Sequence, residues 1–385
     1  MNRLLRPGAL RAACAGLAAA LFALPPLPAG VLPPLQEGAT TAAPARTRPE
    51  PPQHTLLWRV EREDGPPAYL FGTIHVPDDR VNALHPQVKE VLNAADAIYG
   101  EVSPEEMEEA PNLIAEEARL PEGQTLHELL PEDLWNDLDE IFREHSLPLQ
   151  LFDRFEPFMI SVTLESLDLL PQLSSGKTPL DLRILKVARA KGKRIGGVER
   201  AADQVDKLAN ALTVEEQVHA LRLAVDAYLE TKASAGLAPI ERMMRAWLSG
   251  SEKALLALAY GQFDPADPIQ YKSLDALLFQ RNPGMADAVD RLLREFPDDR
   301  FVFLFGSLHF VGPENVVELL RRKGYRVTRL LAPTPEMEEA WLREEGLAED
   351  WEAAVRVMEE LGTMPSPVPE APAPAAAPEP AGAPR

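Results

Sequence analysis

The sequence predicts an α/β (α+β) protein, with a mixed central sheet built from its N- and C-terminal segments and a large helical insert between them. Three observations indicate this fold. Strand-like apolar segments lie near both ends of the domain, and helical spacing of apolar residues fills the middle. A strand-like segment in each half also ends in the same phrase, "YLFGTIHV" at 69–76 and "FLFGSLHF" at 303–310.

The N-terminal half of the sheet begins with two predicted strands at 56–61 and 68–72, which an Asp-Gly-Pro turn separates. Pro86 then marks the start of a helix with one apolar face, and a third strand follows at 97–102. A helix between strands is typical of α/β proteins.

The middle of the chain is predicted to be helical, with one short strand at 194–199. Thr213 and Glu216 have the spacing of a capping box, and Gly192 ends the helix before the strand. Helical spacing recurs at 105–118, 131–145, 157–170, 179–190 and across 201–293.

The C-terminal half begins with a wholly apolar strand at 301–305, which is typical of a strand buried on both faces. A helix at 313–323 and a final strand at 325–331 follow, and 336–361 is an acidic amphipathic helical segment.

Residues 1–30 are predicted to be a signal peptide. Arginines precede an apolar run of 13 residues at 12–24, which is too short to span a bilayer as a helix. An uncleaved anchor, or an alanine-rich segment that only imitates a signal, are the alternatives. The prediction places the protein outside the cytoplasm, either secreted or in the periplasm or cell envelope.

The rest of the chain divides by composition into four regions. We expect a Pro/Thr-rich linker at 31–54, the folded domain at 55–332, an acidic helical extension at 333–361, and a disordered Pro/Ala-rich tail at 362–385.

Charge and cysteine content restrict the possible partners. The net charge of −21 argues against nucleic-acid binding, because that needs a basic surface. The only cysteine is Cys14, so an intrachain disulfide and a cysteine-based zinc site are both excluded. Contact with a membrane is expected only through an uncleaved N-terminal segment, and the oligomeric state stays open.

The repeated phrase places His75 and His309 just beyond two strand ends. Gly in the phrase allows a sharp turn, and ligands of α/β proteins bind at the carboxyl edge of the sheet. Glu101 and Glu199 follow two other predicted strands. Each residue alone could be a helix cap or a loop charge. Together, two histidines and one or two carboxylates form a metal set suited to Mn, Co, Zn or Fe, and not to Ca.

Arg281 and Asn282 end one predicted helix and begin the next. A guanidinium and an amide at a helix end in a cleft could stabilise an anion or an oxyanion. The alternative is an arginine that is favoured at a helix C-terminus by the helix dipole.

The motifs "YLFGTIHV", "YGEV", "LLFQRNPGMADAV" and "FVFLFGSLHF", in this order, resemble the TraB/GumN/PrgY family, which includes the Tiki metalloproteases. The resemblance implies a fold similar to that of Tiki proteins and erythromycin esterases, and metal-dependent proteolysis with Mn or Co. It carries the family's Gly-x-x-His histidines onto His75 and His309, its acids onto Glu101 and Glu199, and its Arg-Asn pair onto Arg281 and Asn282. Gln280 stands where the family usually has Glu.

The leading hypothesis is therefore an extracytoplasmic metal-dependent hydrolase that acts on a peptide or protein. His75, Glu101 and His309 would hold the metal and Glu199 would be the general base, although the two glutamates could exchange roles. Arg281 with Asn282 would stabilise the oxyanion. The alternatives are a non-catalytic protein that binds a peptide or signal, in the manner of pheromone-shutdown members of the family, and a metal-independent ester hydrolase.

Overall fold

The computed structural model of the protein describes residues 49–233 and 236–363. The predicted signal peptide at 1–30, most of the linker and most of the C-terminal tail lie outside the described residues.

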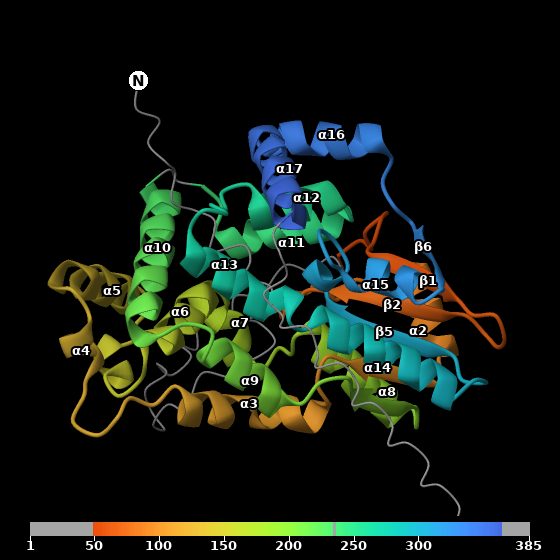
Figure 1. The fold of residues 1–385 in the computed structure, drawn as a ribbon, viewed down its shortest axis with the longest axis horizontal. Coiled ribbons are helices and arrows are strands. Elements are labelled where there is room, and N and C mark those ends of the chain that lie inside the picture. Colours follow the sequence, from red (N-terminus) through yellow and green to blue (C-terminus); the bar gives the residue numbers. More distant parts are fainter. Residues whose placement is uncertain (1–48, 234–235, 364–385) are drawn as a thin grey trace, which may run out of the picture.

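Six strands form one mixed sheet in the order β4-β3-β5-β2-β1-β6 (Figure 1). The strands β2, β3, β4 and β5 run parallel, and β1 runs antiparallel to both β2 and β6. All six correspond to strands predicted from the sequence, and the four parallel ones end at one edge of the sheet. Their bounds are β1 Leu57–Glu61, β2 Ala68–Thr73, β3 Ala97–Gly100, β4 Arg194–Gly197, β5 Phe301–Gly306 and β6 Arg326–Leu330.

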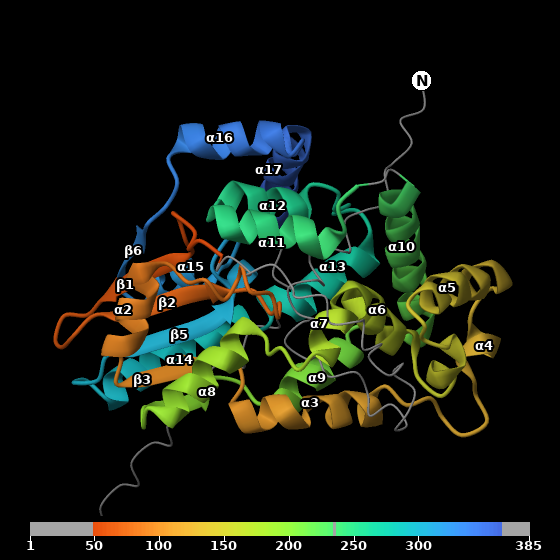
Figure 2. The same ribbon diagram turned by 180° about the vertical axis from the view of Figure 1, so that it is seen from behind.

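Helices cover both faces of this sheet. Figure 1 shows α14 (Asn282–Glu295) and α15 (Val316–Arg322) on the near face. Figure 2 shows α2 (Pro86–Ala94) and α8 (Leu180–Ala190) on the other. Every residue of β5 is buried, as expected for an apolar strand between two helical layers.

The helical insert occupies the connections from β3 to β4 and from β4 to β5, and it lies beside the sheet (Figure 1). The predicted helix at 157–170 is interrupted after Ser166, whose hydroxyl donates back to the Thr163 carbonyl at 2.9 Å, a bond that tends to bend helices. The insert comprises α3 Pro104–Glu117, α4 Leu126–Leu129, α5 Glu132–Glu144, η2 Leu149–Phe152, α6 Pro157–Ser166, η3 Leu167–Leu169, α7 Leu170–Ser174, α9 Ala201–Ala209, α10 Val214–Ala233, α11 Pro239–Ser249, α12 Glu252–Tyr260, α13 Pro268–Leu274 and the π-helix η4 Asp275–Phe279.

The start of one helix agrees with the sequence prediction, and the start of another differs from it. The predicted capping box is present, because the Glu216 N–H donates to Thr213 Oγ1 at 3.3 Å and the Thr213 N–H donates to the Glu216 carboxylate at 3.0 Å. The helix predicted at 313–323 begins later, where the Asn315 side chain caps α15.

The acidic extension forms two helices, α16 (Pro335–Glu344) and α17 (Ala348–Thr363). Gly346 separates them with a φ of 69°, a left-handed conformation that ends a helix readily. Leu342 and Ala354 are buried in the common hydrophobic core, and α17 packs on α12 (Figure 1). The extension therefore adds a layer to the helical part of the molecule.

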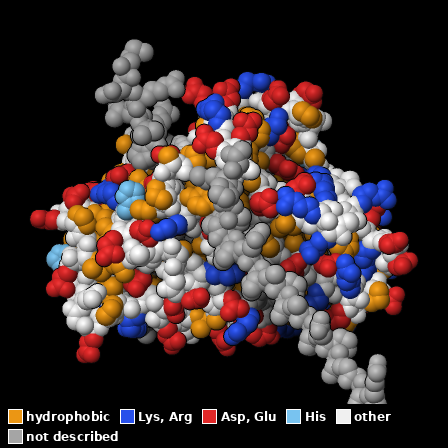
Figure 3. Space-filling view, in the orientation of Figure 1, with side chains coloured by type: hydrophobic (Ala, Val, Ile, Leu, Met, Phe, Trp, Pro, Cys, Tyr) orange, Lys and Arg blue, Asp and Glu red, His pale blue; other side chains and the backbone are white. Residues whose placement is uncertain are grey.

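Acidic and basic side chains are intermixed on the face shown in Figure 3. Many of them form surface ion pairs, such as Arg322 with Glu314 at 2.9 Å. Within the described ranges, none of the helices combines the length and the apolar character that a membrane crossing requires.

The two copies of the repeated phrase lie side by side in the sheet. The register pairs Gly72 with Phe305 and Thr73 with Gly306. The Thr73 hydroxyl donates to the Phe305 carbonyl at 3.1 Å, and the Ser307 hydroxyl donates to the Thr73 carbonyl at 2.8 Å. The hydroxyl residue of each copy thus ties the end of one strand to the other.

Candidate active site

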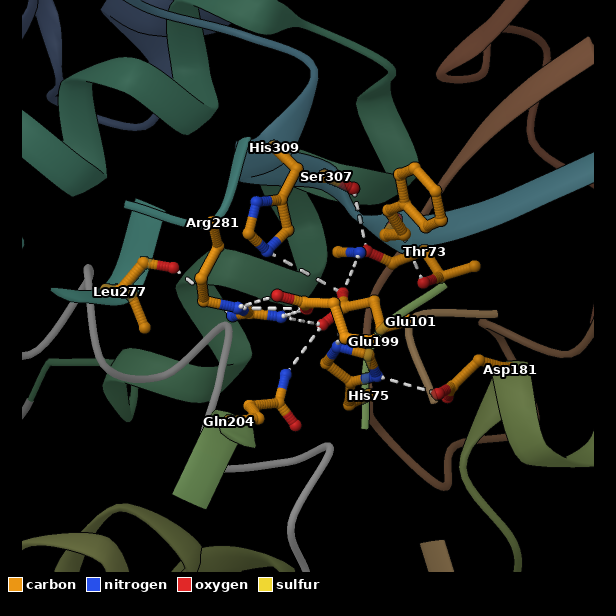
Figure 4. A network of polar contacts seen from close by, with 12 residues as sticks. Thr73, His75, Glu101, Asp181, Glu199, Gln204, Leu277, Arg281, Ser307 and His309 are labelled. Atoms are coloured by element: carbon orange, nitrogen blue, oxygen red, sulfur yellow. Dashed lines mark hydrogen bonds and ion pairs between the residues drawn. The ribbon is translucent and has the colours of Figure 1, made fainter. Parts of the chain in front are cut away.

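The ends of the four parallel strands bring His75, Glu101, Glu199 and His309 into one cluster, in which only Glu199 is partly exposed (Figure 4). The Nε2 atoms of both histidines lie 3.8 Å from the same atom, Oε1 of Glu101. Both histidines and Glu101 are only 2% exposed. The cluster therefore has the composition that the sequence predicted, with Glu101 at its centre.

Gly306 lies between these side chains at the end of β5. Its N–H donates to Glu101 Oε1 at 2.6 Å. A Cβ atom at this position would lie 3.2 Å from Glu101 Oε1 and 3.3 Å from His75 Nε2. Both contacts are tighter than usual, so a side chain here would push the two groups apart. The glycine of the second phrase thus permits a close approach. The prediction that glycine is needed for a sharp turn was wrong, because Gly306 has an ordinary φ of −52° and Gly72 is not among the glycines with positive φ.

Asp181 orients His75, a role that the sequence alone does not reveal. Its Oδ2 lies 3.0 Å from Nδ1 of His75, which leaves Nε2 facing Glu101 (Figure 4). Burial alone would lower the pKa of His75, but Asp181 and then Glu101 outweigh it and raise the pKa to about 10. In the sequence, Asp181 has the position of an ordinary acid in the first turn of a helix. Its spacing to Ile184 and Leu185 places it on the buried face of α8. This spacing is the feature of the sequence that could have predicted its burial.

Asn282 orients His309. The Nδ1 of His309 lies 2.7 Å from the amide oxygen of Asn282, which can only accept, so Nδ1 carries the hydrogen and Nε2 carries the lone pair. The Asn282 amide nitrogen donates to the Glu314 carbonyl at 2.9 Å, which fixes its orientation. Burial lowers the pKa of His309 to about 3. The negative charge of Glu101 would raise this pKa, but the positive charges of Arg281 and His75 oppose that effect.

Arg281 is fully buried and joins the two glutamates. Its Nη2 donates at 2.6 Å to Glu101 and at 2.6 Å to Glu199, and its Nε donates to Glu199 at 3.1 Å. Its Nη1 donates to the Leu277 carbonyl at 3.2 Å. Burial alone would raise the pKa of Glu101, but Arg281 and the histidines hold it well below its usual value. The pKa of Arg281 is raised, because the two glutamates outweigh burial.

The π-helix η4 ends at Phe279, two residues before Arg281, and such turns are frequent at functional sites. A second residue that the sequence did not reveal, Gln204, donates to Glu101 Oε2 at 3.1 Å. It lies on the buried face of α9 with Ala201 and Val205, so its burial could have been predicted from helical spacing.

Glu199 differs from Glu101 in its surroundings. Its side chain is 11% exposed, and its hydrogen bonds come from Arg281. Glu101 is 2% exposed and faces both histidines. The two carboxylates that the sequence could not distinguish therefore occupy different environments.

Within the described part of the chain, no group of three or more His, Cys, Asp or Glu side chains already has the geometry of a metal-binding cluster. The residues nevertheless fit a divalent cation by their chemistry. Two imidazole nitrogens and one carboxylate oxygen converge. Neither nitrogen of the buried His75 ring makes a hydrogen bond of good geometry, although Nδ1 lies 3.0 Å from Asp181 Oδ2. The second nitrogen of each ring faces an acceptor, as is usual for metal-bound histidine.

The formal charge of the cluster also fits a divalent cation. Glu101, Asp181 and Glu199 contribute three negative charges and Arg281 one positive charge, so the sum is −3 + 1 = −2 when both histidines are neutral, the form in which they bind a metal. Without a metal, the raised pKa of His75 keeps that ring protonated, and its charge reduces the sum to −1. Buried charge must be paired. A divalent cation between two neutral histidines would balance the charge of −2. The raised pKa of His75 reflects the same attraction of the cluster for positive charge.

Comparison with known proteins finds one matching family. The model of the TraB/PrgY/gumN family matches residues 56–329, which include all of the site residues described above. No solved structure gives a significant match.

Several curated proteins are similar to the chain. Metalloprotease TIKI2 of Xenopus tropicalis is 28% identical over 314 residues, which cover 71% of this chain and 59% of the relative. Metalloprotease TIKI1 of Homo sapiens is 26% identical over 341 residues, covering 78% and 67%. Uncharacterized protein YbaP of Shigella flexneri is 23% identical over 254 residues, covering 66% and 88%. The chain thus spans about three fifths to two thirds of the length of these metalloproteases.

Proposed function

This chain belongs to the TraB/PrgY/gumN family, and from that premise we propose that it is a metal-dependent hydrolase of peptides or proteins. The observation that carries the proposal is the pair of imidazole Nε2 atoms, each 3.8 Å from Glu101 Oε1. The metalloprotease names of its relatives support the same reaction class.

In this proposal His75, Glu101 and His309 hold the metal ion. Mn or Co is the expected metal, with Zn or Fe as alternatives. When bound, such an ion polarises a carbonyl group and makes a water molecule more acidic. Asp181 and Asn282 keep both rings turned so that Nε2 faces Glu101.

Glu199 is the proposed general base. Its side chain is more exposed to solvent than that of Glu101. The two histidine Nε2 atoms lie close to Glu101. A base must reach the proton that it removes, so the partly exposed carboxylate is the better candidate. This difference in exposure favours the assignment of Glu101 as ligand and Glu199 as base over the reverse.

Arg281 and Asn282 receive a different proposed role from the one that the sequence suggested. Nε and Nη2 of Arg281 donate to carboxylates, Nη1 donates to a carbonyl, and the Asn282 amide is occupied at both ends. Donors that are already engaged are poor oxyanion ligands. We therefore assign both as positioning residues, with Arg281 holding Glu101 and Glu199 and Asn282 holding His309.

The N-terminal signal pattern supports a location outside the cytoplasm, either secreted or in the cell envelope. A peptide or protein in that compartment is the proposed substrate.

A peptide-library cleavage assay tests the proposed function. The purified chain is incubated with the library in the presence of Mn²⁺ or Co²⁺, with and without a chelator. Cleavage that needs the metal and is lost in His75→Ala and His309→Ala supports the proposal. His219→Ala is the matched control, since His219 lies on the surface of α10 with its side chain 51% exposed.

Two other outcomes would contradict the proposal. Ester hydrolysis that survives chelation would identify the metal-independent esterase that the sequence left open. Saturable peptide binding without any cleavage would identify the non-catalytic binding protein.

A further inference from the structure

A small cavity of about 30 Å³ adjoins the cluster on the side of His309. Thr73 and Gly306, at the ends of β2 and β5, and Ser307 and His309, just beyond β5, line one side of it. Helices α11 and α12 and the π-helix η4 supply the opposite walls. The cavity is therefore continuous with the site, and it is bounded by elements from distant parts of the sequence.

The walls of this cavity are apolar and fixed. Met243, Trp247, Leu255 and Leu277 contribute hydrophobic side chains to them. The Trp247 indole N–H donates to the Gly72 carbonyl at 2.9 Å, so the ring is held against the end of β2 and its polar atom is satisfied. The cavity is thus lined by a ring that is already in place.

Apart from His309, which belongs to the site, the residues at the strand ends add no unpaired hydroxyl hydrogen to the cavity. The Thr73 hydroxyl donates to the Phe305 carbonyl, and the Ser307 hydroxyl donates to the Thr73 carbonyl. Both donors are used within the sheet, so neither demands a polar partner from the cavity. A hydrocarbon group could enter without leaving either hydroxyl hydrogen unpaired.

We propose that this cavity is a specificity pocket that receives a small aliphatic side chain of the substrate, of the size of alanine to valine. The identity of the occupant rests on the proposed hydrolase function, because a peptide that reacts beside His309 must place a neighbouring side chain nearby. The apolar walls favour a hydrocarbon group, since apolar surface gains from leaving water.

The volume of the cavity sets the size limit. One water-sized group needs about 10–15 Å³ on this scale, so 30 Å³ accommodates two or three heavy atoms. An isopropyl group fits that space, and a benzyl group does not. Enlarging the cavity at Leu255 should therefore shift its preference toward larger groups.

Binding of two amides tests the pocket without any requirement for turnover. Isovaleramide presents an isopropyl group next to a peptide-like carbonyl, and 3-phenylpropanamide presents a benzyl group in the same place. Their affinities for the purified chain are measured by ligand-observed NMR titration. We expect the wild type to bind isovaleramide about tenfold more tightly, and Leu255→Ala to reverse the order.

Leu256→Ala is the matched control. Leu256 is the next residue of the same helix, and it faces Gly312 and not the cavity. This variant loses the same side chain and should keep the wild-type preference. Equal binding of both amides to the wild type, no saturable binding, or the same preference in both variants would overturn the pocket. If the protein prefers isovaleramide to 3-phenylpropanamide but cleaves no peptide, the hydrolase function is refuted and the pocket is still supported.

Discussion

His75 and His309 point their Nε2 atoms at one and the same oxygen of Glu101, each at 3.8 Å. The two rings come from strand ends 234 positions apart in the sequence. Each is turned by its own acceptor, Asp181 for His75 and Asn282 for His309. The repeated phrase therefore serves to bring two histidines to one carboxylate.

Asp181→Asn should weaken metal binding by about 10- to 100-fold, because an amide orients the His75 ring less strongly than a carboxylate. Metal affinity is measured by isothermal titration. Asp203→Asn is the control, since Asp203 is also an acid in the first turn of a helix but is exposed. Equal affinities in the two variants would show that Asp181 is only a helix-terminal acid.

Arg281→Met should destabilise the fold by about 3–5 kcal/mol, because it leaves Glu101 buried without its cation. Urea unfolding measures this loss. The comparison is Arg222→Met, which removes ion pairs of a partly exposed arginine and should cost about 0–1 kcal/mol. Similar losses in both variants would argue that the buried ion pairs contribute little.

Gly306→Ala should reduce metal affinity, because the new Cβ would crowd Glu101 and His75 at 3.2 and 3.3 Å. Gly284→Ala is the control. Gly284 lies in α14, and a methyl group added there would meet no atom within 4 Å, so alanine should stabilise the helix by up to about 1 kcal/mol. Thermal unfolding and metal titration of both variants check this. An unchanged metal affinity in Gly306→Ala would contradict the close approach.

Glu199→Gln should retain the metal but lose about 10²- to 10⁴-fold in cleavage rate, as expected when a general base is removed. Metal content and cleavage of the same peptide are measured side by side. Loss of the metal itself would reverse the assignment and make Glu199 a ligand.

The sequence predicted the framework of this site well. Six strands, and the histidines and glutamates at four strand ends, followed from apolar patterning and from the repeated phrase. These features depend on local spacing, which a single sequence displays directly.

The supporting residues were harder to predict, because their partners are far away in the chain. Asp181 has the pattern of a common helix-terminal acid, and only its place on the buried face of α8 distinguishes it. For Arg281 and Asn282 the sequence indicated a polar site. It could not show that their donors are engaged by Glu101, Glu199 and His309, since such pairing depends on side-chain geometry across the fold.

Metal titration of four proteins tests the central claim most directly. Mn²⁺ or Co²⁺ is titrated calorimetrically into the wild type, His75→Ala, His309→Ala and the surface control His219→Ala. We predict one ion per wild-type chain, an affinity at least about 100-fold weaker in each site variant, and no change in the control. A wild type that binds no ion, or site variants that bind it as tightly as the control, would contradict the proposed metal site.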